Sequence, residues 1–159
     1  MNRKLISKLG LEADEYRPGA DDPKRIAEFE KAIGKRLPED YREFLLEFAP
    51  GGFSGNAAFR PLEPTPWSED GLNCFDAFYG VEENSTFDLT TMYRDTRGAI
   101  PSGMFAIGYD SGSNNILMSL NDPKGQIYFE DKDDGEVYLC ANTFTEFLQS
   151  FELLPDEEV

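Results

Sequence analysis

The sequence predicts an α+β fold, in which an antiparallel sheet of about four to six strands packs against N-terminal helices and a C-terminal helix. Two observations support this fold class. Apolar residues recur at helical spacing near both ends of the chain. Between them, short apolar segments follow one another too closely for crossover helices to connect them. The 159 residues contain no internal repeat, low-complexity tract or linker, so we expect a single domain over residues 1–159.

Two helices are expected between residues 22 and 50. Asp22 can cap the first helix, Pro23 suits its first turn, and Gly34 supplies the left-handed residue that ends it. The second helix begins at Pro38 and ends before the Pro-Gly-Gly sequence at residues 50–52. Their core-facing positions are predicted to be Ile26, Phe29 and Ile33 in the first, and Tyr41, Phe44, Leu45 and Phe48 in the second.

Two further helices are predicted after residue 80. A weaker one runs from about Thr86 to Arg94, behind Asn84 and Ser85. The closing helix begins at Thr143, which forms a capping-box pattern with Glu146, and Pro155 ends it. Its apolar stripe is expected to comprise Phe144, Phe147, Leu148 and Phe151.

The strands are predicted between these helices. Their expected ranges are residues 75–79, 104–108, 115–120, 126–130 and 137–140. Turn sequences at residues 122–125 and 133–135 separate the later strands, and connections this short require antiparallel neighbours. The pairing of residues 53–74 does not follow from the sequence.

A polar loop, Asp110-Ser111-Gly112-Ser113, separates two of these strands. Such a loop either binds a ligand or forms the turn of a hairpin. Because no helix follows it, no helix N-terminus is available to hold a phosphate group. Its residue types suit left-handed and side-chain-bonded conformations, so we predict a hairpin turn.

The residue inventory excludes several kinds of catalytic and metal site. Histidine is absent, which removes Ser-His-Asp and Cys-His nucleophiles and all His-ligated metal sites. Residues 130–135 resemble a calcium loop, but Lys132 stands where an EF-hand needs an oxygen ligand and Ala141 where it needs Glu. We therefore expect no catalytic residue, no metal and no cofactor. Because 31 acidic residues always include close carboxylate pairs, a carboxylate- or metal-dependent hydrolase remains a less favoured alternative.

Cys74 and Cys140 form no C-x-x-C pattern, and we expect two reduced, mostly buried thiols that are not bonded to each other. This usage is typical of a reducing compartment. The N-terminal sequence contains no apolar core of a signal peptide, and no apolar segment approaches the roughly 20 residues that span a bilayer. The expected location is the cytoplasm, without membrane association.

The net charge of −16 is distributed unevenly along the chain. Residues 1–60 hold eleven of the fifteen Lys and Arg, whereas residues 61–93 hold none and residues 122–159 hold eleven acids against two bases. This pattern either serves solubility alone or attracts a basic partner. Direct binding of nucleic acid is not expected, because the same charge repels a phosphate backbone.

The order of these motifs resembles the SMI1/KNR4 (SUKH) superfamily over about residues 20–152. The first half of the resemblance is carried by Ile26, Phe29, Glu30, Gly34, Leu37-Pro38, Asp40-Tyr41, Phe44-Leu45 and Gly51-Gly52. The second half is carried by Ile100-Pro101, the residues 105–108, the residues 125–129 and Thr143 with Glu146-Phe147-Leu148. Ala49-Pro50 stands where the family usually has Asn before the glycines, and residues 53–74 match poorly.

The resemblance implies an α+β fold without known catalytic activity. Many bacterial members of this superfamily look like immunity proteins, which neutralise toxins, often nucleases, of contact-dependent or polymorphic toxin systems. Yeast members resemble scaffold-like regulators of cell-wall synthesis. The leading hypothesis is therefore an immunity protein that binds a basic toxin domain. The alternative is a regulatory adaptor that binds a cellular protein. A monomer is the default expectation.

The partner surface is expected to combine aromatic residues with acidic loops. Trp67 follows a proline-rich stretch, where a large aromatic residue either plugs the core or anchors a partner. The candidate partner-binding residues are Trp67, Glu69, Asp70, Tyr79, Glu82, Glu83, Tyr109, Asp110, Asp131, Asp133 and Asp134. Reversing Asp131, Asp133 and Asp134 to Lys is expected to weaken partner binding without unfolding the protein, since loop charges add little stability.

Overall fold

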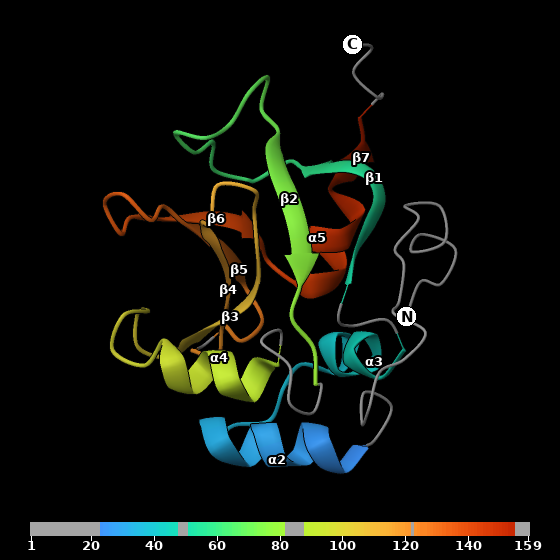
Figure 1. Ribbon diagram of the computed structural model, residues 1–159, viewed down its shortest axis with the longest axis vertical. Helices are drawn as coiled ribbons and strands as arrows, with labels where there is room; N and C mark the ends of the chain where they lie inside the picture. Colours follow the sequence, from blue (N-terminus) through green and yellow to red (C-terminus); the bar gives the residue numbers. More distant parts are fainter. Residues whose placement is uncertain (1–22, 48–50, 82–87, 122, 155–159) are drawn as a thin grey trace.

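The computed structural model describes residues 23–47, 51–81, 88–121 and 123–154, which form helices and a single sheet (Figure 1). The helices are α2 (Pro23–Ile33), α3 (Glu39–Glu47), α4 (Leu89–Asp95) and α5 (Phe144–Gln149). The strands are β1 (Gly51–Phe59), β2 (Asn73–Phe78), β3 (Met104–Tyr109), β4 (Asn115–Ser119), β5 (Ile127–Glu130), β6 (Val137–Ala141) and β7 (Phe151–Leu153).

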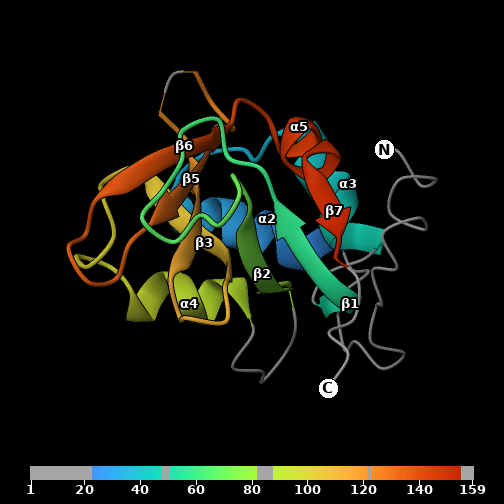
Figure 2. The ribbon, with the colours of Figure 1, turned by 90° about the horizontal axis from the view of Figure 1, so that it is seen from above.

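The sheet has the strand order β6-β5-β4-β3-β2-β1-β7, and all neighbours are antiparallel. The predicted α+β class is confirmed. The seven strands exceed the expected four to six, because β1 and β7 were not predicted. Seen from above in Figure 2, the sheet curls. The segment after β1 reaches the far edge strand, where Leu62 N donates to Cys140 O (3.1 Å) and Glu63 N to Leu139 O (2.8 Å).

The two N-terminal helices are confirmed, and each is tied to its neighbour by hydrogen bonds. Gly34 ends α2 with a φ of 74°, and its N–H donates to Glu30 O at 2.9 Å. The Glu30 carboxylate then accepts from Leu37 N at 2.7 Å, which fixes the turn into α3. Asp40 in α3 accepts from both the backbone N and the hydroxyl of Thr145 at 2.9 Å, joining α3 to the start of α5.

The core between the helices and the sheet is a cluster of aromatic side chains. The ring centroid of Phe44 lies 4.9 Å from those of both Phe78 and Phe144. Phe147 packs on Phe59 and Phe151 at 5.1 Å each. The predicted core positions Phe29, Phe44, Phe147 and Phe151 and the predicted covered residue Tyr41 are all buried.

Helix α5 is shorter than predicted, and the expectation that it extends to Pro155 is wrong. It ends at Gln149, where Ser150 donates its hydroxyl to Phe147 O at 2.7 Å. Phe151 then begins β7 and pairs with Phe59 of β1. Phe151 is buried in either conformation, so its spacing did not distinguish a fourth helical position from the first residue of a strand. The strand conformation also satisfies backbone groups along the free edge of β1.

Helix α4 begins later than predicted, at Leu89. Its N-cap is Asp88, whose carboxylate accepts from Thr91 N at 3.1 Å. The predicted start of this helix at residues 84–86 lies outside the described residues, as do Asp22, Phe48, Pro50 and Pro155.

Both cysteines are free, which confirms the prediction that they are not bonded to each other. Cys140 is buried, but Cys74 is exposed, so the expectation of two mostly buried thiols is wrong for Cys74. The reason is the alternation of side chains in β2, where Phe75 takes the core face and Cys74 the opposite one.

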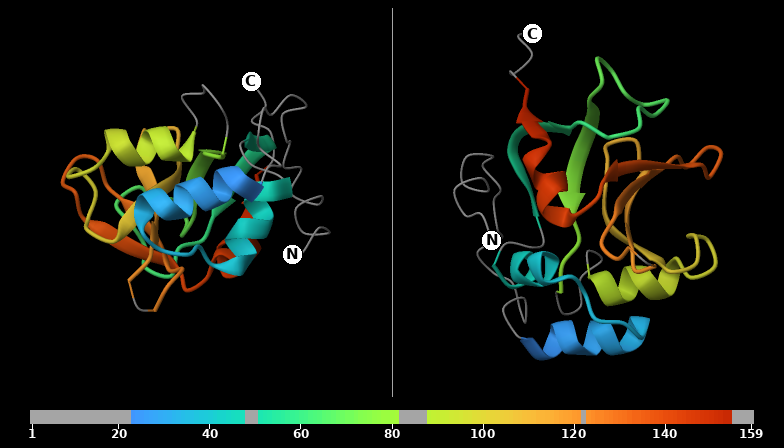
Figure 3. Two further views of the ribbon diagram at one scale, coloured as in Figure 1. Left: turned by 90° about the horizontal axis from the view of Figure 1, so that it is seen from below. Right: turned by 180° about the vertical axis from the view of Figure 1, so that it is seen from behind.

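Figure 3 shows how the fold separates its two ends. Helices α2, α3 and α4 gather at one end, and the loops that connect β1 to β2, β3 to β4 and β5 to β6 lie at the other. The helical end therefore holds much of the core, and the loop end is left to face solvent.

The Phe44→Ala variant should lose about 3–5 kcal/mol of unfolding free energy, because its ring is fully buried among other aromatic rings. Urea denaturation followed by circular dichroism measures this loss. Leu62→Ala is the matched control, since Leu62 is 58% exposed and its truncation should change stability by less than about 0.5 kcal/mol. Equal losses in the two variants would contradict the core assignment.

The two thiols should react with 5,5′-dithiobis(2-nitrobenzoate) at very different rates. Cys74 is exposed and should react at once in the native protein. Burial raises the pKa of the Cys140 thiol, so both access and thiolate formation are suppressed there. We expect one fast thiol in native protein and two in urea. A Cys74→Ser variant without any fast thiol would confirm the assignment, and a fast thiol in that variant would refute it.

Candidate protein-binding surface

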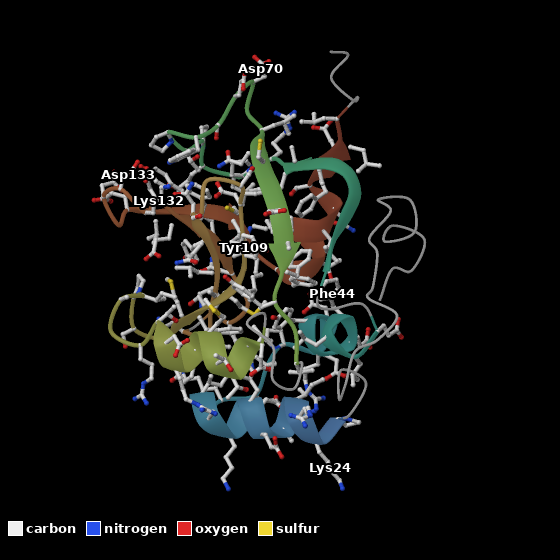
Figure 4. All side chains as sticks on the ribbon, viewed as in Figure 1. Lys24, Phe44, Asp70, Tyr109, Lys132 and Asp133 are labelled. Carbon is white, nitrogen blue, oxygen red and sulfur yellow. The ribbon has the colours of Figure 1, made fainter. Side chains whose placement is uncertain are left out.

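Three loops form one surface at the end of the sheet opposite α2 and α4 (Figures 1 and 4). They are residues 60–72 between β1 and β2, residues 110–114 between β3 and β4, and residues 131–136 between β5 and β6. We call them together the three-loop surface. Hydrogen bonds within and between these loops fix the positions of the side chains that the surface presents.

The first loop is held by a cluster of small polar side chains. Asn73 Nδ2 donates to Thr65 Oγ1 at 2.8 Å, and Thr65 N donates to Ser68 Oγ at 2.9 Å. The Ser68 hydroxyl also bonds the Asn73 side-chain oxygen. Trp67 N donates to Thr65 Oγ1 at 3.1 Å, so the backbone that carries Trp67 belongs to this cluster.

The second loop is the predicted hairpin turn, which the structure confirms. Strands β3 and β4 pair on either side of it, and Asp110 N donates to Asn114 O at 3.1 Å. The Asp110 carboxylate accepts from Gly112 N (3.0 Å), Asn114 N (2.7 Å) and Asn114 Nδ2 (2.9 Å). Asp110 is only 5% exposed, so its carboxylate organises the turn from inside.

The third loop repeats this arrangement around another buried carboxylate. Asp131 is 4% exposed and accepts from Asp133 N at 2.9 Å, while its carbonyl accepts from Gly135 N at 2.7 Å. Lys132 N donates to the side-chain oxygen of Asn114 at 3.0 Å. Asn114 is fully buried, and it joins the second loop to the third.

Trp67 is the point at which all three loops meet. A Cβ added at Gly112 would lie 2.9 Å from Cζ3 of the indole, so the tryptophan occupies space that only glycine leaves free there. The Lys132 ammonium lies 5.7 Å from the centre of the ring. Trp67 is nevertheless 40% exposed. Trp67 is therefore not a fully buried plug, since it lies against the loops outside the main core cluster and stays partly exposed. Its role as an anchor for a partner stays a prediction.

The three-loop surface carries exposed acidic side chains. They are Glu63, Glu69, Asp70, Asp133, Asp134 and Glu136. The surface also carries Lys132 and Arg60, the latter in an ion pair with Glu152 at 3.3 Å. Partial desolvation and then the field of Asp134, Asp131, Glu136 and Glu63 raise the pKa of Tyr138 in β6. The carboxylates of the third loop and Glu63 thus contribute a negative field at Tyr138.

Most of the basic side chains that the structure describes lie at the opposite end, on and around α2 and α4, together with exposed acids such as Glu28, Glu39 and Asp95. The exposed basic ones are Lys24, Lys31, Lys35, Arg36, Arg94 and Arg97. Figure 4 shows Lys24 at this end, and Asp70 and Asp133 at the other. Among the described residues, acidic side chains therefore predominate at the loop end, whereas the helical end carries both signs of charge.

The candidate partner-binding residues occupy three kinds of position. Trp67, Glu69, Asp70, Asp133 and Asp134 are exposed on the three-loop surface, and Tyr109 is half-buried at its base. Tyr79, Asp110 and Asp131 are buried, and Glu82 and Glu83 lie outside the described residues. The triple reversal of Asp131, Asp133 and Asp134 to Lys is expected from the sequence to spare the fold because all three are loop charges, but Asp131 is buried. A lysine there would bury a charge and leave the Asp133 amide without its acceptor, so Asp131 does not belong in such a variant.

Tyr79 packs against Tyr109, with ring centroids 5.4 Å apart. Burial, followed by the proximity of Tyr109, raises the pKa of Tyr79 to about 12. Tyr109 in turn has its pKa raised by burial and by Asp76. The pair is thus a protonated contact that supports the base of the surface, and Tyr109 alone of the two reaches solvent in part.

The sequence also predicts that the acidic stretches at residues 61–93 and 122–136 form one negative face if the sheet brings them together, and the described residues form a smaller one. Residues 60–72 and 131–136 come together, but Asp88 caps α4 at the helical end. The turn after β4 also lies at that end, where the Lys124 ammonium donates to Arg36 O at 2.6 Å. The acidic stretches at residues 61–93 and 122–136 are therefore split between the two ends of the fold.

Several residues of the surface were not predicted. Leu62, Glu63 and Glu136 are exposed there, and Asn73 and Asn114 hold its loops from inside. Glu63 and Glu136 could have been found from their turn positions in acidic stretches. The two asparagines have no distinguishing signal in the sequence, because their bonding partners belong to folded loops.

Two findings concern other kinds of site within residues 23–47, 51–81, 88–121 and 123–154. No three or more Cys, Asp or Glu side chains in these ranges are placed to hold a metal ion together. No helix in these ranges is long and apolar enough to cross a membrane.

The Asp110→Ala variant should lose about 2–4 kcal/mol of unfolding free energy, because three N–H donors at a buried turn lose their acceptor. Asp133→Ala makes the same chemical change at an exposed loop position and should cost less than about 0.5 kcal/mol. Urea denaturation of both variants compares them. A similar loss in both would mean that the turn does not depend on the Asp110 carboxylate.

Comparison with known proteins agrees with this architecture. The SMI1 / KNR4 family (SUKH-1) pattern matches residues 22–150. The chain is also 28% identical, over 173 residues, to the SPbeta prophage-derived uncharacterized protein YokK of Bacillus subtilis (strain 168). That alignment covers 97% of this chain and 84% of the Bacillus protein. Since the family pattern extends over most of the sequence, the chain belongs to the SMI1 / KNR4 family (SUKH-1).

Proposed function

We propose that this chain is a non-catalytic protein-binding module, an immunity protein that neutralises a basic toxin domain by covering its functional surface. The three-loop surface is the proposed contact. The observation that carries the proposal is the partly exposed Trp67 on a three-loop surface that also bears exposed carboxylates, with the two hairpin loops held by buried hydrogen bonds. An exposed aromatic anchor with a charged surround is typical of protein interfaces.

The two hairpin loops are ordered before a partner binds, which favours high affinity. Asp110, Asn114 and Asp131 satisfy the backbone groups of the two hairpin loops before any partner arrives. Little conformational entropy is then lost on association, and this entropy is a main cost of binding through loops.

The charge distribution favours a basic partner. The loop end is negative and the helical end carries most of the exposed basic side chains, so the field orients the protein as a basic partner approaches. Nuclease toxins are commonly basic, because their substrate is a polyanion. An acidic protein that covers such a substrate groove blocks it without needing any catalytic group of its own.

The family and the relative support the same role. Many bacterial members of the SMI1/KNR4 superfamily look like immunity proteins. The Bacillus subtilis relative is named as prophage-derived. The partner proposed here is a toxin encoded beside the gene for this chain.

The test is neutralisation of that neighbouring toxin, followed by the kinetics of association. Co-expression with the toxin should restore growth, and the purified protein should inhibit it at a one-to-one ratio. The association rate constant should fall as salt rises above about 0.15 M, because screening then acts within about 8 Å. A toxin that stays fully active at excess protein would reject the immunity role and favour a regulatory adaptor.

Charge reversal at the three-loop surface should slow association without unfolding the protein. The appropriate variant combines Asp133→Lys with Glu136→Lys, since both side chains are exposed. Asp134 is left unchanged, because its carboxylate accepts a hydrogen bond from Glu136 N at 2.9 Å. We expect at least a tenfold lower association rate constant. Glu28→Lys with Asp95→Lys makes the same change in net charge at the helical end, as the matched control. An equal effect of both variants would place the contact elsewhere.

A further inference from the structure

We infer that the exposed face of Trp67 is a subsite for an arginine side chain of the basic partner, and that Lys132 occupies this subsite in the free protein. The inference deepens the proposed function and rests on it. It concerns the chemistry by which the three-loop surface recognises its partner.

The free protein already holds a cation at this ring. The Lys132 ammonium lies 5.7 Å from the centroid of Trp67, within the range over which an aromatic face attracts a cation. The Lys132 backbone is fixed by the 3.0 Å bond from its N–H to Asn114. Its side chain is exposed, so the ammonium can leave the ring for water without any change in the loop.

Contacts with two loops hold the indole ring in place. The Trp67 backbone bonds Thr65, and the indole lies against the Gly112 backbone, where a Cβ would be only 2.9 Å away. Forty per cent of the residue nevertheless remains exposed. A side chain that is fixed by its own protein and still partly exposed can contact a group of a partner at little cost in conformational entropy, because it is already ordered.

The surroundings favour arginine as the incoming group. A guanidinium is planar and weakly hydrated, so it stacks on an indole more favourably than an ammonium does. The exposed carboxylates of Asp133 and Glu136 belong to the same loop as Lys132 and supply negative charge near the ring. An arginine that displaces Lys132 replaces one cation with another, so the ring remains paired while Lys132 gains hydration.

The direct test uses Trp67 as the reporter, because it is the sole tryptophan of the chain. The full-length protein is titrated with oligo-arginine, oligo-lysine and oligo-glutamate peptides of equal length, and indole emission is recorded. We expect oligo-arginine to change the emission at lower concentration than oligo-lysine, and oligo-glutamate to have no effect. Equal titration by both basic peptides would overturn the inference, since it would show attraction by net charge alone.

Variants then separate the ring from the general field, with calorimetry as the readout. Lys132→Gln should tighten oligo-arginine binding about two- to fivefold, because the internal occupant is removed. Lys124→Gln makes the same change of charge at the helical end and should have a smaller effect. When Trp67 is replaced by Leu, adding Lys132→Gln should raise the affinity for oligo-arginine no more than adding Lys124→Gln does. A gain from Lys132→Gln that survives without the indole would overturn the subsite.

These experiments distinguish failure of the arginine subsite from failure of the immunity role. If the neighbouring toxin is inhibited equally well by wild-type protein and by Trp67→Leu, the subsite is wrong and the immunity role stands. If the peptides titrate as expected but the toxin remains active, the subsite stands and the immunity role fails. Circular dichroism of Trp67→Leu verifies that this variant is folded in both experiments.

Discussion

The buried side chain of Asn114 fixes the arrangement on which the three-loop surface depends. Its amide donates to the Asp110 carboxylate and its oxygen accepts from Lys132 N, so one residue links two hairpin loops that are distant in the sequence. A buried amide that left either bond unmade would carry a cost of about 1–3 kcal/mol, which ties the two loops to a single geometry. Trp67 then lies across both loops, against Gly112 and beside Lys132.

The parts of the fold that follow from local pattern were predictable, and those that follow from pairing between distant segments were not. Helices α2 and α3 can be predicted from the spacing of their apolar residues and from terminal residues such as Gly34. Strand β1 has a glycine-rich sequence with little alternation, so its strand conformation follows from its two neighbours, β2 and β7. Phe151 shows the same limit, because its burial fits a helix as well as a strand and only the open edge of β1 decides between them.

The site was predictable in its composition but not in its geometry. The acidic residues at 60–72 and 131–136 and the tryptophan in the first of these segments can be read from the chain. Aspartate, however, serves both as an exposed charge and as an acceptor for turn amides, and these uses look alike in a sequence. Asp133 takes the first role, whereas Asp110 and Asp131 take the second. The contact between Trp67 and Lys132 joins residues 65 positions apart, and only the curl of the sheet brings them together.

The separation of the two ends has a consequence for how such a surface can change. The aromatic core around Phe44 and Phe144 lies with the helices, and the exposed loop residues contribute little to it. Substitutions at Glu69 or Asp133 therefore alter charge and shape at small cost in stability. The buried acceptors below them are constrained in the opposite way, because any replacement must still satisfy the turn amides. A fold built like this can meet a different partner by changing its outer loop residues, provided that Asp110, Asn114 and Asp131 stay.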